Sequence, residues 1–368
     1  MQQRIVANRK YALLLIILIL HQFFRYLGAT SRQKSLEFVV SGYGGLNDSF
    51  WYLGIAEHGY NFAPGGIWSH QSPYVFYPAL SQLVAIGYHL GLPTVWWALF
   101  LVTAITFLAA IQLSRLVSLH FGQRVGYFVA LLFVGQLYAL SLVSIMTESL
   151  FALLVFSALL AWGKKQYNQA AIIVMFACLT KSFAIALAAS LIVSAVVKIR
   201  NKDENFRALI VPISLCAVAP SLWVVFVAIK FSDFTKYFAL QKAGWGNVFN
   251  VGDTFIQFIY QNTFHFQSVS SWALIVTAVC LMTLTLVIWS CTFQVPVEWK
   301  VFLVLCFYIS IAHQSWHIAD ARFLTSIGLA LFPIAVLAER LQRSWRIGLV
   351  VVWLIPSFYI STIALSGF

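Results

Sequence analysis

One aspartate is a candidate for chemistry because it lies in a polar loop of a chain that is mostly apolar. Asp48 lies between Asn47 and the segment Ser49-Phe50-Trp51-Tyr52, and the chain has only 11 acidic residues among 368. A carboxylate in a partly desolvated aromatic loop can act as a general base toward an attacking hydroxyl. Asn47-Asp48-Ser49 before an apolar run is equally typical of a helix N-cap. The spacing alone leaves both interpretations open.

Two further charged residues interrupt long apolar stretches. Glu148 lies where a helix is expected to begin, and the helix dipole favours a carboxylate there, although a capping acid explains it equally. Lys181 divides the apolar stretch 170–197. An ionisable residue in such a place indicates function, and its ammonium suits a lipid phosphate. The alternative is a turn lysine whose charged end reaches the membrane surface.

A second group of polar and aromatic residues lies in 238–246. Gln241 and Trp245 stand there beside Gly244 and Gly246. Such a set suits sugar binding, in which an aromatic face stacks on the sugar ring and an amide bonds its hydroxyls. The alternative interpretation is a tryptophan anchor at the membrane interface.

The stretch 313–322 gathers polar side chains within one predicted turn. Arg322 is a candidate bidentate ligand for phosphate, and a structural pair with Asp320 accounts for part of the pattern. His313 and His317 are four residues apart, but no third ligand follows. We therefore expect no metal site.

The composition identifies lipid as the main solvent. Hydrophobic residues make up 61% and charged residues 9%, whereas a soluble domain carries roughly 25% charged residues. The net charge of +12 comes from cations in short loops, where they set topology and contact anionic headgroups, so we exclude a nucleic-acid-binding protein. The five cysteines all lie in apolar segments and are expected to be buried hydrophobic side chains.

The apolar pattern predicts an all-α, polytopic integral membrane protein of about eleven transmembrane helices in a single domain, 1–368. The first, 11–27, resembles a signal peptide but has no cleavage site, so we interpret it as a retained helix. We expect 76–90 to lie along the interface, because most of the 23 Lys and Arg then fall on the N-terminal, cytoplasmic side. Two long loops, 28–95 and 230–271, then lie outside with most of the acids. The predicted spans are 11–27, 96–115, 125–145, 149–162, 168–180, 183–197, 208–229, 272–292, 301–312, 323–338 and 347–365.

Several motifs together resemble a known family of membrane enzymes. The run from Asp48 to Tyr60, followed by Phe76-Tyr77-Pro78, resembles the first luminal loop of the GPI mannosyltransferase II (PIG-V-like) family, especially its prokaryotic members. Further elements follow in order: Thr147-Glu148-Ser149-Leu150-Phe151, Thr180-Lys181-Ser182, Gln241-Lys242-Ala243-Gly244-Trp245-Gly246 and Arg322-Phe323. The chain departs from the family pattern at Asn47, where an aromatic residue is common, and at Lys181, where arginine is usual.

The resemblance implies a GT-C fold with its site on the external or luminal face. It implies a glycosyltransferase that takes a sugar from a polyprenyl-phosphate carrier, such as dolichol phosphate mannose, and inverts the anomeric centre. Asp48 would be the catalytic base and Glu148 a second acid at the site. Lys181 and Arg322 would bind the donor phosphate. The remaining candidates for sugar or acceptor binding are Trp51, Tyr52, Glu57, His58, Gln241, Trp245 and His317.

We therefore expect an inverting transferase for a hexose, most simply mannose, acting on an unidentified glycan, lipid or protein acceptor. The lipid-linked donor is already activated, and the chain has no phosphate-binding glycine loop, so no cofactor or metal is expected. The short loops favour a prokaryotic cell membrane. A lipid transporter or flippase is the alternative, although we find no internal repeat. A non-catalytic scaffold is a third possibility, which Asp48→Asn distinguishes from an enzyme.

Overall fold

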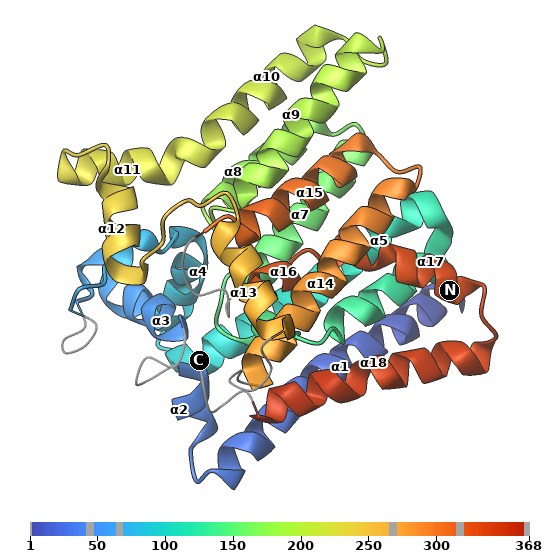
Figure 1. The fold of residues 1–368 in the computed structure, drawn as a ribbon, viewed down its shortest axis with the longest axis horizontal. Coiled ribbons are helices and arrows are strands. Elements are labelled where there is room, and N and C mark those ends of the chain that lie inside the picture. Colours follow the sequence, from blue (N-terminus) through green and yellow to red (C-terminus); the bar gives the residue numbers. More distant parts are fainter. Residues whose placement is uncertain (1, 42–47, 64–68, 265–270, 314–319, 364–368) are drawn as a thin grey trace. The chain divides into compact units, whose positions relative to one another are not determined.

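The structure, a computed structural model, describes residues 2–41, 48–63, 69–264, 271–313 and 320–363. Across these residues the secondary structure is helical, apart from one isolated bridge between Phe249 and His313 (Figure 1). The predicted all-α class is confirmed. The chain folds into two compact units, each assembled from segments that are distant in the sequence.

The first unit consists of Met1–Glu57, Leu80–Leu160 and Leu331–Phe368. Its helices, some of which extend by a few residues past these limits, are α1 (Gln2–Ser31), α2 (Leu36–Ser41), α3 (Ser49–His58), α4 (Pro78–His89), α5 (Thr94–Val134), α6 (Leu140–Val143), α7 (Glu148–Gly163), α17 (Phe332–Glu339) and α18 (Arg343–Ile363).

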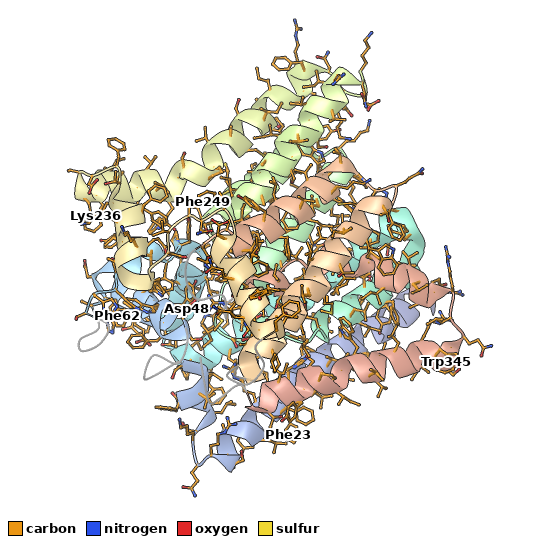
Figure 2. The ribbon with its side chains drawn as sticks, viewed as in Figure 1. Phe23, Asp48, Phe62, Lys236, Phe249 and Trp345 are labelled. Carbon is orange, nitrogen blue, oxygen red and sulfur yellow. The ribbon has the colours of Figure 1, made fainter. Side chains whose placement is uncertain are left out.

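Helices α1 and α18 lie side by side, and polar groups fix them to the end of α5 (Figure 1). The buried His21 ring lies 2.8 Å from Ser361 Oγ and 3.0 Å from the carbonyl of Val134. Trp353 Nε1 donates to the carbonyl of Leu132 at 2.9 Å. The last carbonyls of a helix have no partner within the helix, and lipid cannot donate a hydrogen bond to them. These side chains supply the missing donors. Away from this contact, Phe23 on α1 and Trp345 on α18 are 50% and 69% exposed, as lipid-facing side chains would be (Figure 2).

Helix α5 is broken at Gly122, whose φ of 84° and ψ of 164° are not helical. A residue with a Cβ rarely adopts such a conformation, so glycine permits the sharp change of direction. The break falls between the predicted spans 96–115 and 125–145. The second of these ends at Val134, earlier than predicted, because Gly135 terminates the helix and only the four-residue α6 follows.

The second unit consists of His58–Ala79 and Ala161–Ala330. Its elements are η1 (Gly59–Asn61), η3 (Pro73–Val75), α8 (Tyr167–Cys178), α9 (Ala184–Arg200), α10 (Phe206–Val218), η4 (Ala219–Ser221), α11 (Leu222–Phe231), α12 (Lys236–Trp245), α13 (Asp253–Phe264), α14 (Ser271–Thr292), α15 (Val297–Ile311), α16 (Asp320–Thr325) and η7 (Gly328–Leu331).

In this unit α9 packs against α15, and α10 packs against both α8 and α9 (Figure 1). A chain of side-chain bonds crosses the α9–α15 contact. Trp162 Nε1 donates to Ser194 Oγ at 3.0 Å, and Ser194 Oγ donates to Glu298 Oε2 at 2.8 Å. All three side chains are buried, so their polar atoms depend on one another.

Five of the described helical segments are long and apolar enough to cross a membrane: Tyr11–Ser31, Thr94–Val134, Phe206–Phe231, Ala273–Thr292 and Arg343–Thr362. The chain is therefore an integral membrane protein, while the count of eleven crossings stays a prediction. The predicted span 323–338 is not one helix: α16 ends at Thr325, and η7 and α17 follow. Pro333 near the start of α17 explains this, since proline fits the first turn of a helix but not its interior.

Candidate functional site

Two predicted phosphate ligands lie against the same aromatic ring in the second unit. Lys181 Nζ is 4.5 Å from the ring centroid of Phe323, and Arg322 Cζ is 4.9 Å from it. The Phe183 ring packs edge-on against Phe323 at 5.0 Å and lies 4.8 Å from Lys181 Nζ. The ring faces attract both cations and hold them together. We call Lys181, Phe183, Arg322 and Phe323 the cation cluster.

The position of Lys181 follows from the turn between α8 and α9. Its backbone N–H donates to the carbonyl of Ala177 at 3.1 Å, and its own carbonyl accepts from Ala184 N–H at 3.1 Å. The residue is only 8% exposed. A cation so shielded from water attracts an anion more strongly than a surface lysine does. This burial favours the functional interpretation of Lys181 over that of a turn lysine reaching solvent.

The start of α16 is fixed by a hydrogen bond between two side chains. His313 Nε2 lies 2.8 Å from Asp320 Oδ1, and the Asp320 side chain is fully buried. Thr254 Oγ1 donates to the carbonyl of His313 at 3.0 Å and so fixes the backbone of the histidine. The sequence suggested Arg322 as a partner of Asp320, and the structure shows His313 as a partner of this carboxylate. His317 lies outside the described residues.

The first long loop contacts the turn that carries Lys181. Ala79 N–H donates to the carbonyl of Leu179 at 3.0 Å, two residues before the lysine. At the same point in the loop, the ring of Phe76 packs edge-on against Trp245 at 5.4 Å. The motif elements around Phe76, Lys181 and Trp245, which are far apart in the sequence, are therefore neighbours in the second unit.

A set of buried phenols connects the first loop to α12. Gln241 Nε2 donates to Tyr237 Oη at 3.0 Å, and the rings of Tyr77 and Tyr237 pack edge-on with 6.0 Å between their centroids. Burial, and then the neighbouring Tyr237, raise the pKa of Tyr77 well above its ordinary value. Burial also raises the pKa of Tyr237. Gln241, a predicted sugar ligand, is therefore anchored to Tyr237 by its amide nitrogen.

The two predicted catalytic acids belong to the first unit, and each lies at a helix N-terminus. The carbonyl of Asp48 accepts from the N–H groups of Trp51 and Tyr52 at 3.0 and 3.2 Å, which places Asp48 directly before α3 (Figure 2). Asp48 is partly exposed. Glu148 is the first residue of α7 and is 1% exposed. The positive end of each helix dipole stabilises a negative charge at both positions.

The other candidates in the first loop differ in their exposure. Trp51 and Tyr52 are buried, at 4% and 6% exposed, so they form the core side of α3 rather than an open surface. Glu57 is half-buried at the end of that helix. His58 is exposed and stacks on Phe62, with 5.9 Å between the ring centroids. Of these four, Glu57 and His58 are the more accessible to a ligand.

Tyr77 and Phe323 belong to motifs found in the sequence but had no predicted role, and Phe183 and Tyr237 were not among the predicted site residues. Phe183 follows Lys181 by two residues, and Phe323 directly follows Arg322. The sequence places an aromatic residue close to each of the two cations, Lys181 and Arg322. This proximity could have predicted that the rings pack against them. Tyr77 and Tyr237 carried no comparable signal, because their contact joins a loop to a helix that is distant in the sequence.

Solved structures with similar folds are known. ArnT from Cupriavidus metallidurans bound to undecaprenyl phosphate matches 82% of this chain and 58% of its own chain, with 16% identity and a TM-score of 0.53. The Archaeoglobus fulgidus oligosaccharyltransferase in the apo form matches 96% and 56%, with 12% identity and a TM-score of 0.51. The chain therefore spans less than two thirds of either protein.

Both neighbours are membrane glycosyltransferases of the GT-C superfamily, so the predicted GT-C fold is confirmed. No protein-family model matches the chain, and no curated protein does. The particular likeness to GPI mannosyltransferase II stays a prediction from the motifs.

Proposed function

We propose that the protein is a glycosyltransferase that moves a hexose from a polyprenyl-phosphate carrier to the hydroxyl of an acceptor. The observation that carries this proposal is the cation cluster, in which Lys181 and Arg322 lie against the Phe323 ring. Two cations held together, one of them largely buried, suit an anion such as a lipid phosphate. The GT-C fold, found also in ArnT solved with undecaprenyl phosphate, supports a lipid-linked donor.

In the proposed reaction Asp48 accepts the proton of the acceptor hydroxyl. The oxygen then attacks C1 of the sugar from the face opposite the carrier. The new C1–O bond forms as the bond from C1 to the phosphate oxygen breaks, so the configuration at C1 is inverted. The electron pair leaves with the polyprenyl phosphate. Lys181 and Arg322 stabilise the charge that develops on that phosphate.

We assign Glu148 as a second acid at the site. Gln241 and Trp245 are our candidates for sugar contact. Gln241 donates to Tyr237, and its Oε1 accepts from Asn247 at 3.4 Å and keeps a second lone pair that can accept from a hydroxyl. We propose mannose as the sugar and the external face of a prokaryotic cell membrane as the location. These assignments rest on the motif resemblance and on the distribution of loop charge.

The experiment is a transfer assay with the purified full chain and a panel of polyprenyl-phosphate sugars. We expect release of the free carrier phosphate, with mannose as the preferred sugar. Asp48→Asn should abolish transfer but leave the folded protein intact, because asparagine is nearly isosteric and also caps helices. Asp203→Asn, an exposed aspartate in the loop between α9 and α10, is the control and should leave transfer unchanged.

Two results would overturn the proposal. One is full transfer by Asp48→Asn, which would remove the assigned base. The other is the absence of transfer by the wild-type chain with any donor, together with movement of a labelled lipid across proteoliposomes. That second result would identify a flippase.

A further inference from the structure

The corner at which α11 meets α12 exposes aromatic side chains beside lysines, and the transfer reaction above uses none of them (Figure 1). Phe234 and Phe238 are 82% and 62% exposed. Single exposed apolar side chains are ordinary, whereas a contiguous group marks a surface that contacts a membrane or another molecule. We call this group the basic aromatic surface, and its residues are Lys230, Phe231, Phe234, Lys236, Phe238 and Lys242.

The backbone at this corner is held by hydrogen bonds. Helix α11 ends at Phe231, and Ser232 follows in a left-handed conformation with a φ of 53°. Asp233 N–H donates to the carbonyl of Ala228 at 3.0 Å, which closes the helix as a Schellman motif does. Oδ1 of Asp233 accepts from the N–H and from the hydroxyl of Thr235 at 2.8 and 2.7 Å, directly before α12. The exposed rings therefore project from an ordered turn.

The two sides of α12 have different surroundings. At about 100° per residue, Tyr237 and Gly244 lie on one side of the helix, and both are buried. The first loop covers that side, where Gln71 Nε2 donates to the carbonyl of Gly244 at 3.1 Å. Phe238 and Lys242 lie one turn apart on the other side, and both are exposed. The outer side of α12 thus presents an aromatic ring and a lysine together.

The basic aromatic surface has an excess of positive charge. Residues 230–246 contain three lysines and one acid, Asp233, which already accepts two hydrogen bonds within the turn. Lys230 and Lys242 are exposed. Lys236 lies at the corner, with its Nζ 5.3 Å from the ring centroid of Phe231 (Figure 2). An anionic partner complements such a surface.

This surface continues the exposed side of a membrane-spanning segment. Phe206–Phe231 is long and apolar enough to cross a membrane, and Phe226 and Ile229 near its end are exposed. Phe231 and Phe234 follow where that segment ends. Aromatic side chains with lysines beside them are typical of helices in the membrane interface. A second copy of the chain fits less well, because a symmetric contact would place like charges against each other.

We propose that the basic aromatic surface binds anionic phospholipid at the membrane interface. The rings of Phe234 and Phe238 lie among the upper parts of the acyl chains, and the lysine ammonium groups reach the headgroup phosphates. The lipid bound here is bulk phospholipid, so the proposal does not depend on the transfer reaction. Because α12 also carries Gln241 and Trp245, lipid binding would hold the helix that bears these two candidates for sugar contact.

Photo-crosslinking tests where the rings lie. The full chain is made with p-benzoylphenylalanine in place of Phe234 or of Phe238 and is placed in vesicles of equal phosphatidylcholine and phosphatidylglycerol. After irradiation, mass spectrometry identifies the adducts. We expect phospholipid adducts at both positions, with phosphatidylglycerol favoured roughly threefold because the lysines attract anionic headgroups. The control label replaces Val218, an exposed residue far from the lysines within the span, and should react with the two lipids in equal yield.

Removing the lysines tests the charge. The variant combines Lys230→Gln, Lys236→Gln and Lys242→Gln with the label at Phe234. Adducts should still form, because the ring stays in place, but the preference for phosphatidylglycerol should disappear. The matched control removes three exposed cations between α9 and α10 and should keep that preference. Its substitutions are Arg200→Gln, Lys202→Gln and Arg207→Gln.

Three results would overturn the proposal. Cross-linked protein dimers in place of lipid adducts at Phe234 and Phe238 would identify a surface between copies of the chain. The absence of any adduct at both positions would place the rings in water. Equal yields of the two lipids in the presence of the lysines, or a preference that survives their removal, would exclude binding of anionic headgroups by these lysines.

Discussion

His313 Nε2 lies 2.8 Å from Oδ1 of Asp320, and the aspartate side chain is fully buried. Asp320 begins α16, and two residues later that helix carries Arg322 and Phe323 of the cation cluster. Replacing His313 would leave a buried carboxylate without this partner. The pair therefore connects the stability of the second unit with the placement of its cations.

We expect His313→Phe to lower the free energy of unfolding by about 2 kcal/mol, because the buried Asp320 carboxylate loses one hydrogen-bond partner. Chemical denaturation in detergent measures this loss. The double variant His313→Phe/Asp320→Leu should recover much of the stability, since the buried carboxylate is then removed as well. A double variant as unstable as the single one would contradict this explanation.

The cation cluster makes a separate prediction about activity. Lys181→Met should lower kcat by about 100-fold, the usual cost of removing one group that stabilises a developing negative charge. Phe323→Leu keeps both cations but removes the ring, and we expect a roughly tenfold loss. Steady-state kinetics with the preferred donor measure both effects. Lys164→Met, an exposed lysine after α7, is the matched control, and an equal loss there would exclude a specific role for Lys181.

The sequence predicted the class of fold and the order of the motifs because both depend on local patterns. Apolar runs located most of the helices, and single charges within them identified Glu148 and Lys181. Contacts between distant loops had no such local signal. The contact of Tyr77 with Tyr237 depends on how the first loop packs against α12, which side-chain periodicity does not encode.

The buried phenols should link α12 to the first loop energetically. Tyr237→Phe removes the hydroxyl that accepts from Gln241 and keeps the ring that packs against Tyr77. We expect a loss of about 1 kcal/mol in the free energy of unfolding. Limited proteolysis should detect loosening of α12 as faster cleavage. Tyr260→Phe, at an exposed tyrosine of α13, should leave the cleavage rate unchanged.

The same phenols predict a stability change at alkaline pH. The pKa of Tyr77 is raised in the folded protein, so the neutral phenol is favoured there. Its contribution to stability is complete below the unfolded pKa of about 10 and is lost as the pH rises above it. Thermal unfolding is measured from about pH 8 to about pH 11, a range that includes the unfolded pKa. The Tm of the wild type should fall over this range. Tyr77→Phe should show a smaller fall, and an identical profile would contradict the assignment.

Hydrogen bonds join Trp162, Ser194 and Glu298 in one network. The variant that tests this network and its control both lie in α9. Ser194 Oγ accepts from Trp162 at 3.0 Å and donates to Glu298 at 2.8 Å, so Ser194→Ala leaves both buried partners without it. We expect a loss of about 2 kcal/mol in the free energy of unfolding.

Ser190 lies one turn earlier in α9 and is equally buried, and among the described residues its hydroxyl bonds to the carbonyl of Leu187. Ser190→Ala removes a hydroxyl without stranding another side chain, so its cost should be well below that of Ser194→Ala. Equal costs would mean that the network adds nothing beyond the burial of one hydroxyl.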